Sequence, residues 1–183
     1  PRSMREPDLC HAWCTTSTVN LLQASAAAGV RRLVLASTSA VYGDSTFVSK
    51  RETDPSAPLS PYAAAKLAAE AYCQAFQRGF DVETIVLRYF NVFGPRQDPE
   101  GEAGVVAIFS RRMLDDKDVK IFGDGEQSRD FVYVEDVASS VIAVLDTEAQ
   151  GHINIGSGEQ TSVNQIFKQL SAEIGYSKKP IYE

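Results

Sequence analysis

The chain has 183 residues and a net charge of −6, and 44% of its residues are hydrophobic. That length is enough for one domain with a substantial core. The basic residues are scattered, which argues against a nucleic-acid partner and against binding to an anionic membrane surface. No apolar run approaches the length that crosses a bilayer, and no signal peptide is visible, so we expect no membrane association.

The three cysteines are Cys10, Cys14 and Cys73. An odd number of cysteines in mostly helical context fits reduced thiols in a cytoplasmic protein better than a disulfide framework. Cys10, His11 and Cys14 lie close together, but the other histidine, His152, is distant along the chain. We therefore expect no metal site.

Helical and strand patterns alternate along the first half of the chain. Both strands contain continuous apolar runs, Leu33-Val-Leu-Ala and Thr84-Ile-Val-Leu, which are typical of a parallel sheet covered by helices on both faces. The expected elements are helices at 15–28 and 61–78, followed by Gly29 and Gly79, and strands at 31–37 and 82–90.

The second half contains shorter elements. A loop rich in Gly and Pro is expected from 91 to about 104, with a helix after it and a turn at Gly123-Asp-Gly125. Ser162 and Gln165 form a capping-box pattern at the start of the last helix. The other expected elements are strands at 119–122, 131–134 and 153–155 and helices at 135–145 and 162–174. Together these patterns predict an α/β fold with a parallel sheet and flanking helices.

The helices expected at 15–28 and 61–78 are apolar over most of their circumference. The polar residues of the second helix form one narrow stripe: Lys66, Glu70, Gln74, Gln77 and Arg78. A helix of this kind is buried on more than one side. One side must cover the sheet, and the other meets either a second subunit or the neighbouring helix of the same chain. We expect a homodimer through these two helices.

Tyr62 and Lys66 are the most informative pair of residues in the chain. Ser60 is a good N-cap and Pro61 suits the first helical position, so Tyr62 falls in the first turn of a helix. The spacing of four residues places the phenol and the ammonium on one helix face. A free phenol has a pKa near ~10. A neighbouring ammonium stabilises the phenolate and draws this pKa towards neutrality, which makes a usable general base.

A hydroxyl at the end of the preceding strand, from Thr38 or Ser39, could hold a substrate hydroxyl against that base. The Tyr-x-x-x-Lys pattern fixes just two residues, however, and it occurs by chance in many helices. The pair supports a functional interpretation only together with the motifs around it.

Five motifs follow one another along the chain: Ser37-Thr-Ser-Ala-Val-Tyr-Gly43, Pro58-Leu-Ser-Pro-Tyr-Ala-Ala-Ala-Lys66, Leu87-Arg-Tyr-Phe-Asn-Val-Phe-Gly-Pro-Arg-Gln97, Gly123-Asp-Gly-Glu-Gln-Ser-Arg-Asp-Phe-Val-Tyr-Val-Glu-Asp-Val137 and Ile153-Asn-Ile-Gly-Ser-Gly158. With these motifs nearly the whole chain resembles the extended short-chain dehydrogenase/reductase superfamily and its NAD-dependent epimerase/dehydratase family. It is most similar to nucleotide-sugar 4-epimerases of the UDP-glucose/UDP-N-acetylglucosamine 4-epimerase type.

The resemblance implies NAD as the cofactor and a UDP-sugar or other nucleotide-sugar as the substrate. In such enzymes the tyrosine takes a proton from the sugar 4-hydroxyl while NAD takes hydride from the same carbon, and the hydride then returns to the other face. Tyr62 would be the base, and Lys66 would lower its pKa and hold the nicotinamide ribose. Four further residues are implied: Thr38 and Ser39 on the sugar, and Ser37 and Phe90 on the cofactor, with Phe90 beside the nicotinamide.

The resemblance also implies a diphosphate site. Asn91 and Arg129 would bind the diphosphate of the substrate. This role suits Arg129, since a guanidinium can bind phosphate oxygens through two hydrogen bonds. The alternative is a surface ion pair between Arg129 and one of the nearby carboxylates, Asp130 or Glu135.

The end of the first strand separates related chemistries. In the related sugar 4,6-dehydratases the threonine is followed by Asp and then Glu. The related nucleotide-sugar decarboxylases have Glu at the second position after the threonine. This chain has Ser39 and Ala40 there. Without a carboxylate, epimerisation or simple redox at one carbon is favoured, and a dehydratase, decarboxylase or reductase is the alternative enzyme.

The chain departs from the family pattern near its ends. The family opens with a strand, the turn Gly-x-x-Gly-x-x-Gly and a helix that binds the NAD pyrophosphate. This sequence lacks that turn, and it has Cys14 and Ser17 where the family's next helix has Asn and Gly. We expect one incomplete Rossmann-like domain over 1–183, without the Gly-rich NAD-binding half and the C-terminal end. Part of the substrate-binding lobe would lie at about 91–135 and 152–183.

Three hypotheses follow from this reading. The chain could be a fragment of an epimerase whose activity in isolation is doubtful, because the anchor for the NAD pyrophosphate is missing. It could be a non-catalytic remnant or assembly module that dimerises through its apolar helices. It could also be a piece of an intact epimerase, and its start at Pro1 instead of Met favours a fragment or a processed chain.

Overall fold

The computed structural model describes residues 1–44, 49–100 and 104–183. The chain divides into two compact units. Unit 1 consists of Pro1–Phe90 and Val137–Ile155, and unit 2 consists of Asn91–Asp136 and Gly156–Glu183. Within the described ranges, no helix is both long and apolar enough to cross a membrane.

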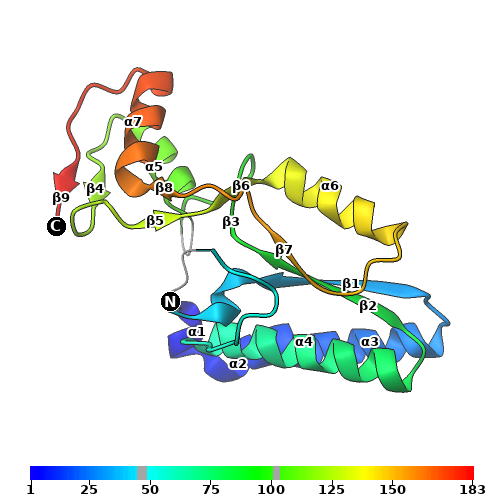
Figure 1. Ribbon diagram of the computed structural model, residues 1–183. Helices are drawn as coiled ribbons and strands as arrows, with labels where there is room; N and C mark the ends of the chain where they lie inside the picture. The colour runs from blue at the N-terminus through cyan, green and yellow to red at the C-terminus, as the bar shows by residue number, and fades with distance from the viewer. Residues whose placement is uncertain (45–48, 101–103) are drawn as a thin grey trace. The chain divides into compact units, whose positions relative to one another are not determined.

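Unit 1 is built on a parallel sheet in the order β1-β2-β7, which confirms the predicted α/β fold. The strands are β1 (Arg32–Thr38), β2 (Glu83–Tyr89) and β7 (Gly151–Ile155). In Figure 1, α3 (Ser17–Ala27) and α4 (Pro61–Gly79) lie on one side of this sheet and α6 (Val134–Leu145) lies on the other. The sheet is therefore covered on both faces, as the continuous apolar strands predict.

Side chains of β2 alternate between the two cores. Val86 packs with Leu22, Ala69 and Cys73 on the side of α3 and α4. Ile85 and Leu87 pack with Val144 of α6 on the other side. Because both sets are apolar, the strand shows no alternation of polar and apolar residues in its sequence.

Local signals set the start of α4. The Ser60 side chain accepts a hydrogen bond from the Ala63 N–H, and Pro61 occupies the first turn. The helical segment before β1 starts earlier than predicted. It runs through α1 (Arg2–Arg5), α2 (Pro7–His11) and a π-helical turn at Ala12–Thr16 into α3. No proline or glycine interrupts the sequence between Pro7 and Gly29, so nothing stops the helix there.

In the described residues of unit 2 there are three short strand pairs and two helices. The pairs are parallel β3 (Asn91–Phe93) with β6 (Phe131–Tyr133), parallel β4 (Lys120–Ile121) with β9 (Ile181–Tyr182), and antiparallel β5 (Ser128–Arg129) with β8 (Thr161–Ser162). The helices are α5 (Val105–Leu114) and α7 (Val163–Ile174), packed around Phe109, Val119 and Ile166.

Several predictions for unit 2 can be compared with its structure. The strands expected at 119–122 and 131–134 and the helix expected at 162–174 are present as β4, β6 and α7. The capping box is confirmed: the Ser162 hydroxyl accepts from the Gln165 N–H, and the Gln165 side chain accepts from the Ser162 N–H. The loop expected from 91 to about 104 begins instead with β3, and its residues 101–103 lie outside the described part of the chain. The assignment of this unit to a substrate-binding lobe stays a prediction.

Candidate active site

Thr38 and Tyr62 lie close together in unit 1. Thr38 is the last residue of β1, and its side chain accepts a hydrogen bond from the Ala40 N–H at 3.2 Å, which caps a short 3₁₀ turn at Ser39–Tyr42. Tyr62 lies in the first turn of α4, close enough to the Thr38 side chain for Thr38 to lower the pKa of the phenol. The structure therefore joins the hydroxyl and the phenol that were predicted to act together.

Lys66 lies one turn further along α4. Its Nζ is 6.0 Å from the centre of the Tyr62 ring, on the same helix face, as the spacing predicts. The Nζ donates a hydrogen bond to the Ala36 carbonyl of β1 at 2.9 Å. One ammonium proton is thus held by the sheet, and two remain for other acceptors.

The pKa of Tyr62 differs from the sequence prediction. Partial burial raises the pKa of Tyr62 above 10.0, the hydrogen bond with Thr38 lowers it, and the neighbouring Cys14 and Cys10 raise it. The expectation of a pKa drawn towards neutrality is therefore wrong for this structure. The side chain is 38% exposed, so solvent still reaches it. A phenol in this environment is protonated at neutral pH, and it accepts a proton only after its surroundings change.

Ser39 and Phe90 lie at the same edge of the sheet. Ser39 directly follows β1 and Phe90 directly follows β2, and Thr38 is paired in register with Tyr89. The Phe90 N–H donates to the Ile155 carbonyl at 3.0 Å, which fixes the end of β2 to the end of β7. This edge is the carboxyl end of the parallel strands, where ligands bind in open α/β sheets.

Ser37 is placed differently from the other candidates. It is buried, and its hydroxyl donates to Glu70 of α4. Glu70 is 1% exposed and accepts two hydrogen bonds from the guanidinium of Arg88, at 3.1 and 2.7 Å. His152 Nε2 lies 3.3 Å from the same carboxylate. Ser37 therefore lies in a buried polar network, and its role beside the cofactor stays a prediction.

Burial and hydrogen bonding have opposite effects on Glu70. Burial alone would raise the pKa of Glu70, but hydrogen bonds from His152, Arg88 and Ser37 lower it to about 2. Arg88 also donates to the Tyr42 hydroxyl at 2.9 Å, and Tyr42 donates to the Asn154 side chain at 2.7 Å. The network therefore connects α4 with the three strands of the sheet.

Sequence reasoning missed this network, although two signals were present. Glu70 is one turn after Lys66 in the polar stripe, and Arg88 is a charged residue inside an apolar strand. Much of the stripe faces the sheet: Lys66 bonds Ala36, Glu70 bonds Arg88 and Gln77 bonds Thr84. A buried charge needs a paired partner, so the two signals together point to an ion pair.

Asn91 and Arg129 lie in unit 2. The main-chain N–H and the side-chain Nδ2 of Asn91 both donate to the Asp130 carbonyl, at 3.0 and 3.1 Å. Arg129 is exposed, and its Nη1 donates to the Ser128 carbonyl at 2.8 Å. Among the carboxylates in the described part of the chain, none forms an ion pair with Arg129. The alternative of an ion pair with Asp130 or Glu135 is therefore not seen.

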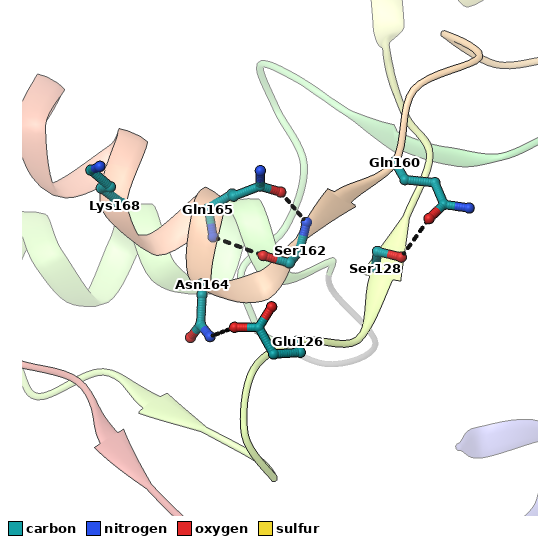
Figure 2. A pocket seen from close by; sticks show the side chains of 7 residues that line it. All are labelled: Glu126, Ser128, Gln160, Ser162, Asn164, Gln165 and Lys168. Atoms are coloured by element: carbon teal, nitrogen blue, oxygen red, sulfur yellow. Dashed lines mark hydrogen bonds between the residues drawn. The ribbon is translucent and has the colours of Figure 1, made fainter.

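A polar hollow of about 420 Å³ also lies in unit 2. Figure 2 shows how its polar groups are paired. The Ser128 side chain bonds Gln160, the Asn164 side chain bonds Glu126, and the Ser162 and Gln165 side chains each accept from the backbone N–H of the other residue. Lys168 completes the lining. No residue predicted for the site lines this hollow, so we do not assign the active site to it.

The chain is similar to several known proteins. A model of the NAD dependent epimerase/dehydratase family matches residues 1–156. A putative UDP-glucose 4-epimerase of Methanocaldococcus jannaschii is 42% identical over 167 residues, which cover 91% of this chain and 54% of that protein.

Two solved structures extend the comparison. The UDP-glucose 4-epimerase of Thermotoga maritima with UDP-glucose has a TM-score of 0.95 and 44% identity, over 99% of this chain and 59% of that one. The Thermus thermophilus UDP-glucose 4-epimerase complex with NAD has a TM-score of 0.82 and 40% identity, over 91% of this chain and 55% of that one. The chain thus spans between 54% and 59% of the length of these three proteins.

Proposed function

Because the chain belongs to the NAD dependent epimerase/dehydratase family, we propose that it carries active-site residues of a nucleotide-sugar 4-epimerase acting on a UDP-sugar. The observation that carries this proposal is that Tyr62 lies beside Thr38, the last residue of β1, with Lys66 on the same helix face. These groups lie where a parallel sheet binds its ligands. Production of UDP-galactose from UDP-glucose in the presence of NAD is the assay that tests it.

In this proposal, residues of unit 1 bind the sugar 4-hydroxyl and take up its proton. Thr38, supported by Ser39, accepts or donates a hydrogen bond at the sugar 4-hydroxyl and holds it against the phenol. Tyr62 takes the hydroxyl proton once its pKa has fallen on ligand binding. Lys66 contributes positive charge beside the phenol, which favours the phenolate.

The residues at this edge fit the nicotinamide end of NAD. Two ammonium protons of Lys66 are left after its bond to Ala36, and ribose hydroxyls can accept them. Phe90 directly follows β2 and would lie beside the nicotinamide, with Ser37 as a further cofactor contact. When bound, NAD supplies the acceptor for a hydride from sugar carbon 4 and returns that hydride to the opposite face.

The residues after Thr38 favour epimerisation over the other reactions of the family. Elimination and decarboxylation need a carboxylic acid or base beside the reacting carbon. Ser39 and Ala40 supply none. A dehydratase, decarboxylase or reductase remains the alternative enzyme, and loss of water or CO₂ from the substrate would identify it.

Asn91 and Arg129 are proposed to bind the diphosphate of the nucleotide-sugar. The exposed Arg129 guanidinium is held by the Ser128 carbonyl and is not neutralised by a carboxylate in the described ranges. Arg129→Ala is expected to weaken UDP binding by roughly ten-fold or more, because charge-assisted hydrogen bonds to phosphate are lost. Calorimetric titration with UDP measures this change.

Arg111→Ala is the matched control for this substitution. Arg111 is an exposed arginine of α5 in the same unit, paired with Asp115. Arg111→Ala removes the same charge as Arg129→Ala, but away from the proposed site, so the affinity of this variant for UDP should stay close to that of the original protein. Equal affinities of the Arg129 variant and the original protein for UDP would refute the phosphate role.

A homodimer through helices 15–28 and 61–78 is also part of the proposal. Leu21 of α3 is 57% exposed, and Tyr72 of α4 is 44% exposed. Apolar side chains at this exposure suggest a surface that a second subunit covers. Leu21→Asp is expected to shift the chain from dimer to monomer in sedimentation velocity, because a charge cannot be buried there unpaired.

The control for the dimer is Gln169→Glu, an exposed change on α7 that adds a charge outside the two helices. A monomeric original protein would contradict the dimer. A stable dimer that binds neither NAD nor UDP would favour the alternative of a non-catalytic assembly module. The three cysteines, read as reduced thiols, make a cytoplasmic location part of the same proposal.

A further inference from the structure

Asp130 has an unusual set of contacts in unit 2. Its Oδ1 accepts from the N–H and the hydroxyl of Ser157, both at 2.8 Å, and its Oδ2 accepts from the Gly158 N–H at 2.8 Å. Three hydrogen bonds to a carboxylate are charge-assisted, and together they hold it in one orientation. The side chain of Asp130 is therefore fixed to the Gly156-Ser-Gly158 segment.

The main chain of Asp130 holds Asn91. Its carbonyl accepts both hydrogen bonds of Asn91, from the main-chain N–H and from Nδ2. The strand register continues this contact, since Asn91 is paired with Phe131, the residue after Asp130. One residue thus fixes both the backbone and the side-chain amide of Asn91.

Arg129 is the residue before Asp130. It is the last residue of β5 and is paired with Thr161 of β8. Asp130 lies between this strand and β6, so its carboxylate anchors the chain at the point where Arg129 leaves the strand pair. The carboxylate is bonded to Ser157 and Gly158 and forms no ion pair with Arg129 in the described ranges.

We propose that Asp130 is a positioning residue that sets the geometry of Asn91 and Arg129 for the diphosphate of a nucleotide-sugar. This inference rests on the diphosphate role proposed above for those two side chains. Asp130 itself does not touch the ligand. It acts through the Asn91 amide, which it orients, and through the backbone of Arg129, which it fixes.

The test uses Asp130→Asn in the full chain, with binding of UDP and of uridine followed by NMR titration. An amide has nearly the shape of the carboxylate, but its NH₂ cannot accept the hydrogen bond from Gly158. We expect UDP affinity to fall roughly ten-fold, which corresponds to about 1.4 kcal/mol, with uridine affinity unchanged. Asp136→Asn removes the same charge from an exposed position of the same unit, and it should leave both affinities unchanged.

The direction of the change separates positioning from simple electrostatics. Removing a negative charge near Arg129 would by itself strengthen binding of an anion. UDP affinity that rises or stays equal in Asp130→Asn would therefore overturn the proposal. Equal losses for UDP and uridine would also overturn it, because a general loss of structure would then be the cause.

A second variant tests the hydrogen bonds to the Asp130 carboxylate without changing any charge. Ser157→Ala removes one of the three hydrogen bonds to the carboxylate and keeps all charges. It should weaken UDP binding in the same direction, but less than Asp130→Asn does. If the original protein fails to bind UDP, the proposed function and this inference fall together. If the original protein binds and Asp130→Asn binds equally well, only the inference falls.

Discussion

Tyr62→Phe is expected to lower any epimerisation of UDP-glucose by this chain by about 10²–10⁴-fold, the usual contribution of general acid–base catalysis. The substitution removes the phenol hydroxyl that is placed to take the proton of a substrate hydroxyl held by Thr38. It keeps the ring, and Tyr62 is partly exposed, so the unfolding midpoint should hardly change. Formation of UDP-galactose in a timed assay measures the effect.

Tyr72→Phe is the matched control, because Tyr72 is an exposed tyrosine of the same helix. It should keep full activity. Tyrosine ¹³Cζ NMR adds a readout that needs no turnover. The signal lost in Tyr62→Phe identifies this residue, and its titration in the original protein should give a pKa above 10.0. Substantial turnover by Tyr62→Phe would refute the assignment of the base.

Glu70→Gln is expected to destabilise unit 1 by about 3–5 kcal/mol, the usual effect of breaking a buried ion pair. Arg88 is 4% exposed, and the substitution would leave its guanidinium charged and without a carboxylate. The hydrogen bond from Ser37 and the contact with His152 would also be weakened. Urea unfolding followed by circular dichroism measures the change.

Glu6→Gln is the control for this change. Glu6 is paired with Arg2 on the surface of the same unit, and about half of each side chain is exposed. Exposed pairs contribute about 0–1 kcal/mol, so this variant should unfold close to the original protein. A loss of stability in Glu70→Gln no larger than that of Glu6→Gln would contradict the buried network.

The same network predicts how stability depends on acid. The pKa of Glu70 is lowered from 4.5 to about 2 in the folded chain. The unfolded state therefore binds this proton first as the pH falls. The contribution of Glu70 is fully present above pH 4.5 and is lost as the pH falls through about 2. Between these values the original protein should lose more stability than Glu70→Gln, and parallel losses would contradict the lowered pKa.

Local features of the fold were predictable from the sequence. Ser60 and Pro61 start α4, and Ser162 with Gln165 starts α7, through contacts within four residues. The parallel sheet was predictable because β1 and β2 contain continuous apolar runs. In unit 2, β4 and β6 match the strands expected at 119–122 and 131–134. The other short strands, β3, β5, β8 and β9, were not expected, because two or three residues carry no periodic pattern.

The candidate site was predictable where it depends on spacing within one helix. Tyr62 and Lys66 share a face as expected, and the end of β1 supplies Thr38. The raised pKa of Tyr62 was not predictable, because it depends first on how deeply the phenol is buried and then on Cys14 and Cys10 from another helical segment. The pairing of Glu70 with Arg88 also joins residues that only the folded sheet brings together.

Calorimetric titration of the chain with UDP, first without and then with NAD, is the measurement to make first. If the chain carries a nucleotide-sugar site, UDP should bind, and Arg129→Ala should weaken that binding while Arg111→Ala leaves it unchanged. Binding of NAD as well would lead directly to the assay of Tyr62→Phe. A chain that binds neither UDP nor NAD would contradict the proposed site.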